Sequence, residues 1–354
     1  MTTRTFAQEI QSGLDVALAS DPTVLVFGLG VPDPKGVFGT TSDLQEKYGD
    51  KRVFDMPTSE NAMTGIAIGA SLGGFKPVLT HQRLDFALLS MDQLVNNAAK
   101  WHFMYGGQRS VPITIRMILG RGWGQGPTHS QNLQSWFAHI PGLKVVMPAM
   151  ASDAKELLLA SIFDPNPVIF LEHRWLHNMQ TETDAPATNN RAPLGKAKVL
   201  QTGDAITIVA MSYMTIEALH AINHLEKQGV ACDLIDLRTV SPIDWPTIEK
   251  SVRKTGKLLV LDTGFKQLGI AGEIMAHITE TCWADLSVAP ARLTAPDFPE
   301  STSPALTKDY HVRAEHIVKQ VGHMIGKDCS GDQLADQRAS SMHDVPGAWF
   351  TGPF

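Results

Sequence analysis

The feature that most constrains the fold is a series of short β-rich runs that alternate with stretches of helical periodicity. In the first half these runs are VLVF (24–27), PVLT (77–80), ITIRM (113–117), KVVM (144–147) and VIFLE (168–172). Apolar residues at helical spacing separate them at 59–73, 85–104 and 152–163. Strands that are apolar on both faces must be covered on both faces, and intervening helices supply that cover. We therefore expect an α/β domain with a parallel sheet.

The same alternation returns after a polar, aperiodic stretch, NMQTETDAPATNNRAPLG (178–195), which is typical of a linker between domains. Strand-like runs follow at 205–210, 232–237 and 258–262, and helical patterns at 213–227, 244–254, 270–281 and 312–326. The sequence thus predicts two doubly wound α/β domains. We place the first domain at residues 1–185, a linker at 186–199, the second domain at 200–326 and a C-terminal tail at 327–354.

The tail is polar at first but ends with the large apolar side chains Trp349, Phe350 and Phe354. Such side chains are costly to leave in water. Two arrangements satisfy them equally well: the tail folds back on its own domain, or it docks on a partner subunit.

Composition excludes several classes of protein. A chain of 354 residues can form two cores, and 43% hydrophobic with 19% charged residues is an ordinary globular balance. A net charge of −6 argues against nucleic acid as a partner. Three widely spaced cysteines form no CxxC pair, which favours a reducing compartment. No apolar run approaches the roughly 20 residues of a membrane span, and the N-terminus lacks signal features, so we expect a cytoplasmic protein.

One carboxylate stands where the chain turns small and apolar. Glu60 opens the run ENAMTGIAIGASLGG (60–74), directly after Thr58 and Ser59. An acid in the first turn of a helix suits the helix dipole, so a purely structural role accounts for this window by itself. A functional role needs support from the rest of the chain.

That support comes from a series of motifs in order: KRVFDMPTSENAMTGIAIGASLGGFKPV, DFALLSMDQLVNNAAKWHFMYGGQ, GPTHSQNLQSWFAHIPGLKVVMP and DPNPVIFLEHR, then DLIDLRTVSPIDWPTIEKSVRKTGKLLVLD. Over residues 5–326 the chain closely resembles the beta subunit of the thiamine-diphosphate-dependent dehydrogenase component of 2-oxo acid dehydrogenase complexes. The resemblance implies a transketolase-like pyrimidine-binding domain followed by a transketolase C-terminal domain. It also implies thiamine diphosphate as the cofactor.

The resemblance assigns three residues to this cofactor. Glu60 matches the acid that hydrogen bonds a ring nitrogen of the aminopyrimidine, favouring the tautomer that activates the thiazolium carbon. The small apolar residues after it would disfavour the carboxylate anion and let a flat ring approach. Phe86 matches the aromatic residue that stacks on the ring, although an ordinary core phenylalanine would look the same. Gln82 matches a neighbouring contact position.

His129, in the loop GRGWGQGPTHSQ (120–131), matches the active-site histidine of the family. A histidine there can bind the substrate carboxylate or carbonyl and act as an acid or base. Most of the 13 histidines of a chain like this one are structural or exposed, which is the alternative for His129.

A set of oxygen-bearing positions matches a monovalent cation site of some family members. It comprises Ile113, Ser161, Asp164 and Asn166, partly through backbone oxygens, and K⁺ would suit these ligands. The alternative is that DPNP is simply a turn that ends a helix.

The chain lacks one part of the cofactor site. The superfamily holds the diphosphate and Mg²⁺ with a GDG motif and a later asparagine, whereas the nearest match here is Gly203–Asp204. We therefore expect a separate alpha subunit to carry that site in an α2β2 heterotetramer, and a lipoyl acyltransferase as a further partner.

The sequence also departs from the family. Leu29 and Gly30 replace a pair of acids, and HQR (81–83), GRGWGQG (120–126) and APDFPESTSPALTKDYH (295–311) are unusual. His81, Arg83, Arg121 and Trp123 could line a pocket for a polar or anionic substrate, since arginine suits carboxylate or phosphate. Equally, they could lie at the surface or at a subunit contact.

Three functions follow. The first is decarboxylation of a 2-oxo acid with transfer of the acyl group to a lipoyl acceptor. The second is a split transketolase-like or acyloin-forming carboligase that acts on a polar or sugar-like substrate without a lipoyl partner. The third is a non-catalytic assembly subunit, which the joint presence of Glu60, Phe86 and His129 disfavours.

Overall fold

The computed structural model describes residues 2–120, 124–183, 189–338, 344–347 and 350. It contains two compact α/β units. The first consists of Met1–Gly120 and Trp136–Leu194, and the second of Arg121–Ser135 and Gly195–Pro353. Both units have parallel sheets covered by helices, so the predicted α/β class is confirmed.

The sheet of the first unit is parallel throughout. Its strands lie in the order β6, β7, β5, β4, β2, β3. Their bounds are β2 (Val24–Gly28), β3 (Val53–Asp55), β4 (Lys76–His81), β5 (Thr114–Leu119), β6 (Lys144–Val146) and β7 (Val168–His173). All six residues of β5 and of β7 are buried, which is why these strands read as near-continuous apolar runs.

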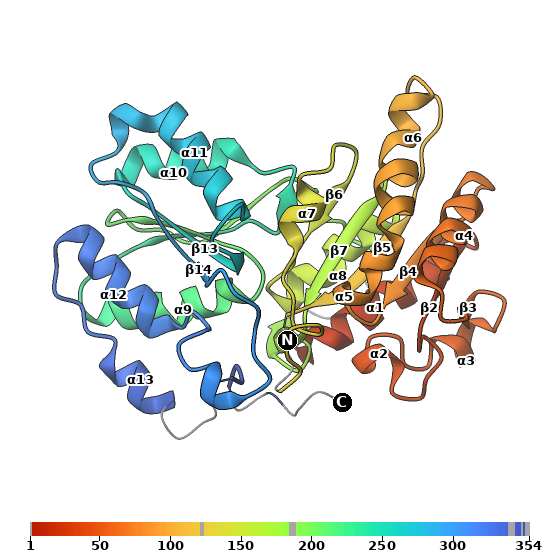
Figure 1. The fold of residues 1–354 in the computed structure, drawn as a ribbon, viewed down its shortest axis with the longest axis horizontal. Coiled ribbons are helices and arrows are strands. Elements are labelled where there is room, and N and C mark those ends of the chain that lie inside the picture. The colour runs from red at the N-terminus through yellow and green to blue at the C-terminus, as the bar shows by residue number, and fades with distance from the viewer. Residues whose placement is uncertain (1, 121–123, 184–188, 339–343, 348–349, 351–354) are drawn as a thin grey trace. The chain divides into compact units, whose positions relative to one another are not determined.

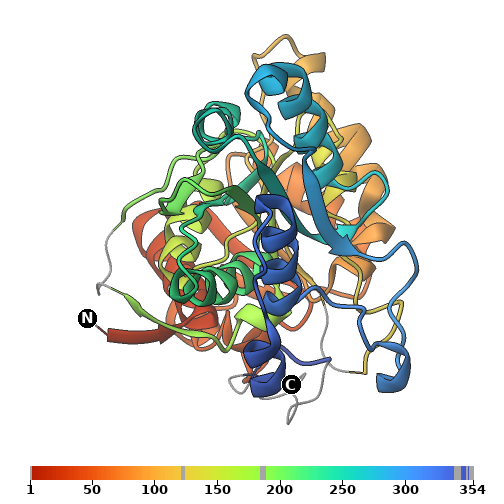
Figure 2. The ribbon, with the colours of Figure 1, turned by 90° about the vertical axis from the view of Figure 1, so that its left-hand side faces the viewer.

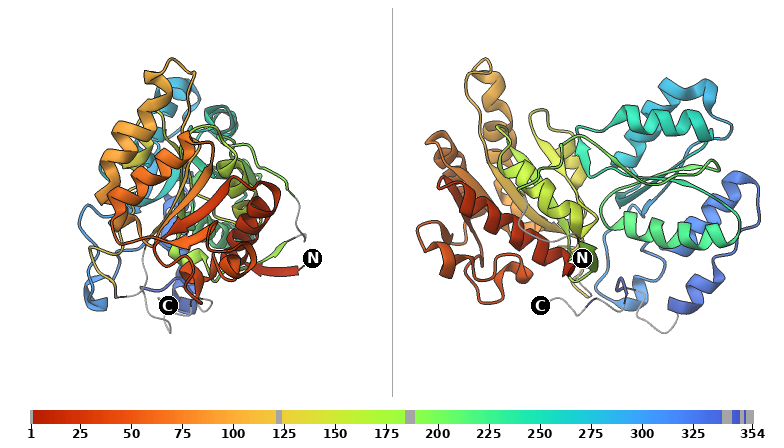
Figure 3. Two further views of the ribbon diagram at one scale, coloured as in Figure 1. Left: turned by 90° about the vertical axis from the view of Figure 1, so that its right-hand side faces the viewer. Right: turned by 180° about the vertical axis from the view of Figure 1, so that it is seen from behind.

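Helices cover both faces of this sheet. On one face α1 (Phe6–Ser20) packs side by side with α8 (Ala151–Ile162), while α4 (Glu60–Leu72) packs on β4 from the other (Figures 1 and 3). The short elements are α2 (Gly36–Gly39), α3 (Leu44–Tyr48), α7 (Gln134–Ala138) and η3 (Arg174–Leu176), and β1 (Thr2–Thr5) pairs antiparallel with β8 (Gln180–Thr183).

The stretch expected to be helical at 85–104 is helical in the structure, but the type of helix changes along it. It consists of α5 (Leu84–Ala87), the 3₁₀ turn η1 (Leu88–Ser90), the π-helical η2 (Gln93–Ala98) and α6 (Ala99–Met104). A π-helical turn holds an extra residue, and apolar spacing alone does not reveal it.

The second unit is a sheet between two helix layers. Strands β13 (Leu258–Phe265), β10 (Thr207–Ala210) and β11 (Asp233–Asp236) form its centre, with β14 (Ala291–Ala295) and the antiparallel β9 (Lys198–Gln201) at the edges. Helices α9 (Tyr213–Lys227) and α12 (Ala314–Ile325) pack together on one face, and α10 (Trp245–Thr255) and α11 (Ile270–Cys282) on the other (Figures 1 and 2). Shorter elements are β12 (Thr239–Ser241), η4 (Trp283–Asp285), η5 (Pro304–Leu306) and α13 (Asp332–Arg338).

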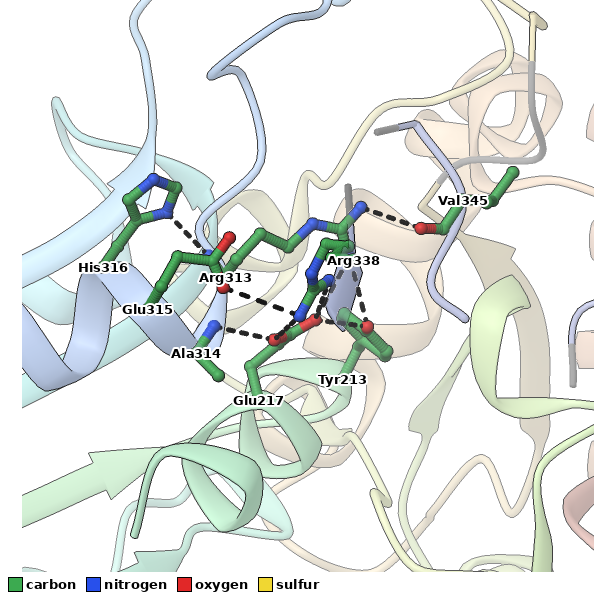
Figure 4. A network of polar contacts seen from close by, with 8 residues as sticks. All are labelled: Tyr213, Glu217, Arg313, Ala314, Glu315, His316, Arg338 and Val345. Atoms are coloured by element: carbon green, nitrogen blue, oxygen red, sulfur yellow. Dashed lines mark hydrogen bonds and ion pairs between the residues drawn. The ribbon is translucent and has the colours of Figure 1, made fainter. Parts of the chain in front are cut away.

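A network of charges inside the second unit holds its C-terminal elements together. The carboxylate of Glu217, on α9, contacts Arg313 Nη1 at 3.1 Å and Arg338 Nη2 at 3.2 Å, and it accepts a hydrogen bond from the backbone of Ala314 at 2.9 Å (Figure 4). Burial by itself raises the pKa of Glu217, but the two arginines lower it to about 2. The carboxylate is therefore ionised, and both arginines and the backbone amide of Ala314 bind it.

The described part of the tail folds back on the second unit. Arg338 at the end of α13 binds Glu217, and Arg313 Nη2 donates to the carbonyl of Val345 at 3.0 Å (Figure 4). Cys329 joins the core that lies beneath α9 and α12. Trp349 and Phe354 lie outside the described residues, so docking of the tail's end on a partner stays a prediction.

Within the part of the chain that the structure describes, no helix has the length and apolar character needed to cross a membrane.

Replacing Glu217 with Gln should lower the free energy of unfolding by about 3–5 kcal/mol, because Arg313 is left buried without its counter-ion and Arg338 keeps only Glu315. Chemical denaturation of the purified chain at neutral pH measures this. Glu280→Gln, an exposed acid on α11, serves as the control and should change stability by less than about 0.5 kcal/mol. Equal effects of the two substitutions would contradict the assignment.

Candidate functional site

Glu60 lies at the start of α4, just after β3 ends. Only 7% of the residue is exposed to solvent. Among the described residues, none forms a hydrogen bond or ion pair with its carboxyl group, and the preceding N-cap residue, Ser59, makes no side-chain cap. Met63 and Ala67, one and two turns further along α4, belong to an apolar cluster. A largely buried glutamate whose carboxyl has no protein partner is unusual, because burial of such a residue is costly.

Three more polar groups meet at the same edge of the sheet, where β2, β3 and β4 end. The amide of Gly30 donates to the Asp55 carboxylate at 3.0 Å. Gly30 has a φ of +72°, and a side chain there would meet Nε2 of Gln82 at 2.6 Å. The carboxyl ends of parallel strands are the usual ligand-binding edge of an α/β sheet. Gly30, where the resemblance led us to expect an acid, therefore makes room for Gln82.

Leu29, the other replaced acid, is part of the apolar packing beneath this edge. It packs against the cluster formed by Phe27, Met63, Ala67 and Leu79. A charged side chain at this position would have no counterpart in that cluster.

Phe86 lies within α5, two residues after the start of the helix. It is partly exposed, so its ring is not an ordinary core side chain. Its neighbours Leu84 and Ala87 are fully buried and fix the short helix against β5. Gln82, at the end of β4, is exposed. The expected cofactor contacts Glu60, Gln82 and Phe86 therefore follow β3 or β4 at the carboxyl edge of one sheet.

His81 and Arg83 are buried, and the possibility that they are surface residues is excluded. His81, the last residue of β4, is 1% exposed, and neither ring nitrogen has a hydrogen-bond partner among the described residues. Burial lowers its pKa from 6.5 to about 4, so the ring is neutral at physiological pH. Arg83 is 5% exposed, and its Nη1 donates to the carbonyl of Gly120 at 3.4 Å.

A second buried arginine lies close to Arg83. Arg174 follows β7, and its guanidinium stacks over the ring of Phe38 at 4.4 Å. Burial, together with the positive charge of Arg83, lowers the pKa of Arg174 to about 10. Arg174 therefore lies near Arg83, and Arg121 and Trp123 lie outside the described residues, so the polar substrate pocket stays a prediction.

Sequence reasoning missed a buried ion pair in the middle of the same sheet. Arg116 on β5 forms two hydrogen bonds with Glu172 on β7, at 2.6 and 2.9 Å, and His177 contacts the same carboxylate at 3.2 Å. Burial raises the pKa of Glu172, but Arg116 and His177 lower it to about 2. The signal was available, because ITIRM and VIFLE each place one charge of opposite sign in an apolar strand.

The loop that carries His129 belongs to the second unit. Gln134 donates from Nε2 to the buried carboxylate of Asp262, on β13, at 2.6 Å. Gly126 has a φ of +73°, and a side chain there would lie 2.2 Å from the hydroxyl of Thr302. His129 is partly buried, and its Nδ1 is 3.0 Å from the hydroxyl of Thr128. The histidine is thus presented by a loop that is fixed at both ends.

The residues expected around a cation lie together at the other edge of the first sheet. The amide of Val168 donates to the carbonyl of Ile113 at 3.0 Å, and the amide of Asp164 donates to the carbonyl of Ser161 at 3.2 Å. Asn166 donates its amide to the Asp164 carboxylate, which also pairs with the ammonium of Lys144. A positive charge therefore already neutralises Asp164, and K⁺ binding stays a prediction.

Comparison with known proteins assigns the chain to a family. Residues 2–179 match the family described as "Transketolase, pyrimidine binding domain", and residues 195–317 match "Transketolase, C-terminal domain". The chain is 38% identical over 317 residues to "Pyruvate dehydrogenase E1 component subunit beta, mitochondrial" of Pisum sativum, covering 89% of this chain and 88% of that one. It belongs to the family of pyruvate dehydrogenase E1 beta subunits.

Two further relatives support the same family. The Bos taurus mitochondrial beta subunit is 39% identical over 298 residues, with 83% of each chain covered, and the Acholeplasma laidlawii beta subunit is 39% identical over 293 residues, covering 83% of this chain and 89% of that one. A solved structure titled "Split gene transketolase, inactive beta4 tetramer" matches the fold with a TM-score of 0.73 at 23% identity, covering 90% and 98% of the two chains. The expected transketolase-like domains are therefore confirmed.

His81 makes stability depend on pH. Its folded pKa is depressed to about 4, so the stability linked to the neutral ring is present above 6.5 and lost as pH falls toward 4. Over this range wild type should lose about 3 kcal/mol more than His81→Leu. Denaturation at a series of pH values measures the difference. His323→Leu, at an exposed site on α12, should follow wild type, and parallel curves for wild type and His81→Leu would refute the burial argument.

Gln134→Leu should loosen the His129 loop without unfolding the second unit, because it removes the hydrogen bond to Asp262. Amide hydrogen exchange followed by mass spectrometry should show faster exchange in peptides that cover 125–133, and unchanged exchange in α9 and α12. The matched substitution Gln108→Leu, at an exposed position of the first unit, should leave that segment as it is. Unchanged exchange in Gln134→Leu would mean that the loop is held by other contacts.

Proposed function

We propose that the chain is the beta subunit of a thiamine-diphosphate-dependent 2-oxo acid dehydrogenase or decarboxylase. The observation that carries the proposal is Glu60, a largely buried glutamate whose carboxyl no described residue pairs with, at the ligand-binding edge of the first sheet. Membership of the pyruvate dehydrogenase E1 beta family supports the same assignment.

The residues at this edge fit the pyrimidine end of the cofactor. The buried acid can hold a proton at a ring nitrogen, and the partly exposed ring of Phe86 offers a face for stacking, worth about 0.5–1.5 kcal/mol beyond its burial. Gln82 is exposed, and Gly30 beside it has no side chain that would clash with it. When bound, thiamine diphosphate supplies a carbon nucleophile for 2-oxo acids.

Each residue then has a defined task. Glu60 holds and returns one proton at the aminopyrimidine, and Phe86 orients the ring. His129 binds the carboxylate or carbonyl of the substrate and moves a proton during transfer of the acyl group to a lipoyl acceptor. The apolar cluster beneath α4, against which Leu29 packs, covers the side of α4 that follows Glu60.

The diphosphate and Mg²⁺ need a partner chain. The sequence holds no GDG motif, and the amide of Gly203 in the nearest match is used by the Asp233 carboxylate at 2.7 Å. Asp204 beside it is exposed at the start of the second sheet. We therefore propose that an alpha subunit holds the phosphates and the metal, in an α2β2 assembly that is the active enzyme.

A specific observation keeps a second function in view. Arg83 and Arg174 form a buried, basic pair, and Arg83 lies three residues before Phe86 in the sequence. Such a pair suits a substrate with carboxylate, phosphate or hydroxyl groups. The chain would then be a subunit of a carboligase that passes a carbon fragment to an aldehyde or sugar without a lipoyl partner.

Glu60→Gln should abolish turnover, by about 10²-fold or more, because the amide cannot exchange a proton with the aminopyrimidine. The measurement is the steady-state rate of the chain reconstituted with its alpha subunit and thiamine diphosphate. Glu46→Gln, an exposed acid of α3, should keep full activity, and both variants should assemble like wild type by light scattering. Wild-type turnover in Glu60→Gln would overturn the mechanism.

The same reconstituted enzyme separates the two functions. Reductive acylation of a lipoyl domain in the presence of a 2-oxo acid supports the dehydrogenase. Ligated products from ketose donors and aldehydes, formed without lipoyl acylation, support the carboligase.

A further inference from the structure

The second unit contains a cavity beside the His129 loop, with a mainly apolar lining and a few polar groups. Its volume is about 170 Å³, large enough for a fragment of several carbon atoms. Residues on both sides of His129 line it, namely Pro127 and the stretch 130–132. The opposite wall is built from the end of β13 and from residues 295–310, part of the segment whose sequence departs from the family.

Two polar groups of the loop lack partners at this cavity. Ser130 is 3% exposed, and its hydroxyl has no hydrogen-bond partner among the described residues. The side-chain oxygen of Asn132 is likewise unmatched, while its Nδ2 donates to the carbonyl of Ser130 at 3.3 Å. Buried polar atoms are normally satisfied, so the unmatched hydroxyl and carbonyl of two residues that line a cavity indicate a place for a hydrogen-bonding ligand.

The facing wall sets the charge that the cavity accepts. Glu300 is 4% exposed and lies 3.1 Å from Nε2 of His311. None of the described residues that line the cavity is a lysine or an arginine. An anion would therefore find no counter-charge, and a cation would compete with His311 for the carboxylate. Neutral groups that donate hydrogen bonds fit best.

Apolar surfaces complete the lining. The ring of Tyr310 is buried, and its hydroxyl already donates to the carbonyl of Phe298 at 3.2 Å. Phe265 and Pro299 also line the cavity. A carbon chain that carries hydroxyl groups matches this combination, since its C–H faces pack on the apolar surfaces while its hydroxyls reach Ser130 and Asn132.

We propose that this cavity binds the hydroxylated end of the substrate on which His129 acts. The ligand class is a short neutral polyol chain. The link to catalysis rests on the second proposed function, the carboligase that acts on hydroxylated substrates, whereas binding itself needs neither cofactor nor alpha subunit. Selectivity arises because a chain without hydroxyls leaves Ser130 and Asn132 without partners.

The test of binding uses the full-length chain alone. Saturation-transfer NMR with erythritol should show contact, and 1-butanol, which has the same carbon skeleton, should show far less. Ser130→Ala and Asn132→Leu should each weaken erythritol binding about tenfold, the effect of one lost hydrogen bond. Gln108→Leu should bind like wild type. Equal saturation of both probes, or none with erythritol, overturns the proposal, as does preferential binding of 1,4-diaminobutane.

The test of catalysis uses the reconstituted enzyme with erythrose and butanal as paired acceptors. Asn132→Leu should raise KM for erythrose about tenfold, and it should leave kcat and the kinetics of butanal unchanged. Unchanged KM for erythrose refutes the role in specificity. A failure of the Glu60 mechanism is distinguishable, because it abolishes turnover of both acceptors and leaves erythritol binding intact. Circular dichroism of Ser130→Ala and Asn132→Leu verifies that both variants are folded.

Discussion

A carboxyl group removed from water must find a partner or lose its charge, and three glutamates in this chain meet that requirement differently. Glu172 is held by Arg116 and His177, and Glu217 by Arg313 and Arg338, so both remain anions with pKa values lowered to about 2. Glu60 is the exception, because no described residue supplies a counter-charge or a hydrogen bond to it. The two paired acids stabilise the sheets and the tail, whereas the third is left for a ligand.

The environment of Glu60 explains why the chain tolerates it. The acid stands at the end of the sheet, above an apolar cluster to which Leu29 contributes, and beside a turn whose glycine leaves space for Gln82.

The sequence predicts the architecture well because long apolar runs and helical spacing are local signals. Strands β2, β4, β5 and β7 and helices α8 and α9 lie where expected. The π-helical η2 and the polar edge strand β9 carry no such signal, since an extra residue in a turn and an edge strand leave periodicity unclear. The burial of His81 and Arg83 was equally hidden. The sequence alone does not show whether polar residues that follow a strand are buried by tertiary packing.

The segment 121–135 has a consequence for how such proteins can diversify. It is encoded in the middle of the first domain but structurally part of the second, where Gln134 is tied to Asp262 and Gly126 abuts Thr302. A gene fusion that exchanges the C-terminal domain at a single junction near residue 195 would separate the His129 loop from the residues of the second unit that it contacts. Recombination that preserves the fit needs two crossovers, so lineages of this fold should inherit the histidine loop and the C-terminal domain together.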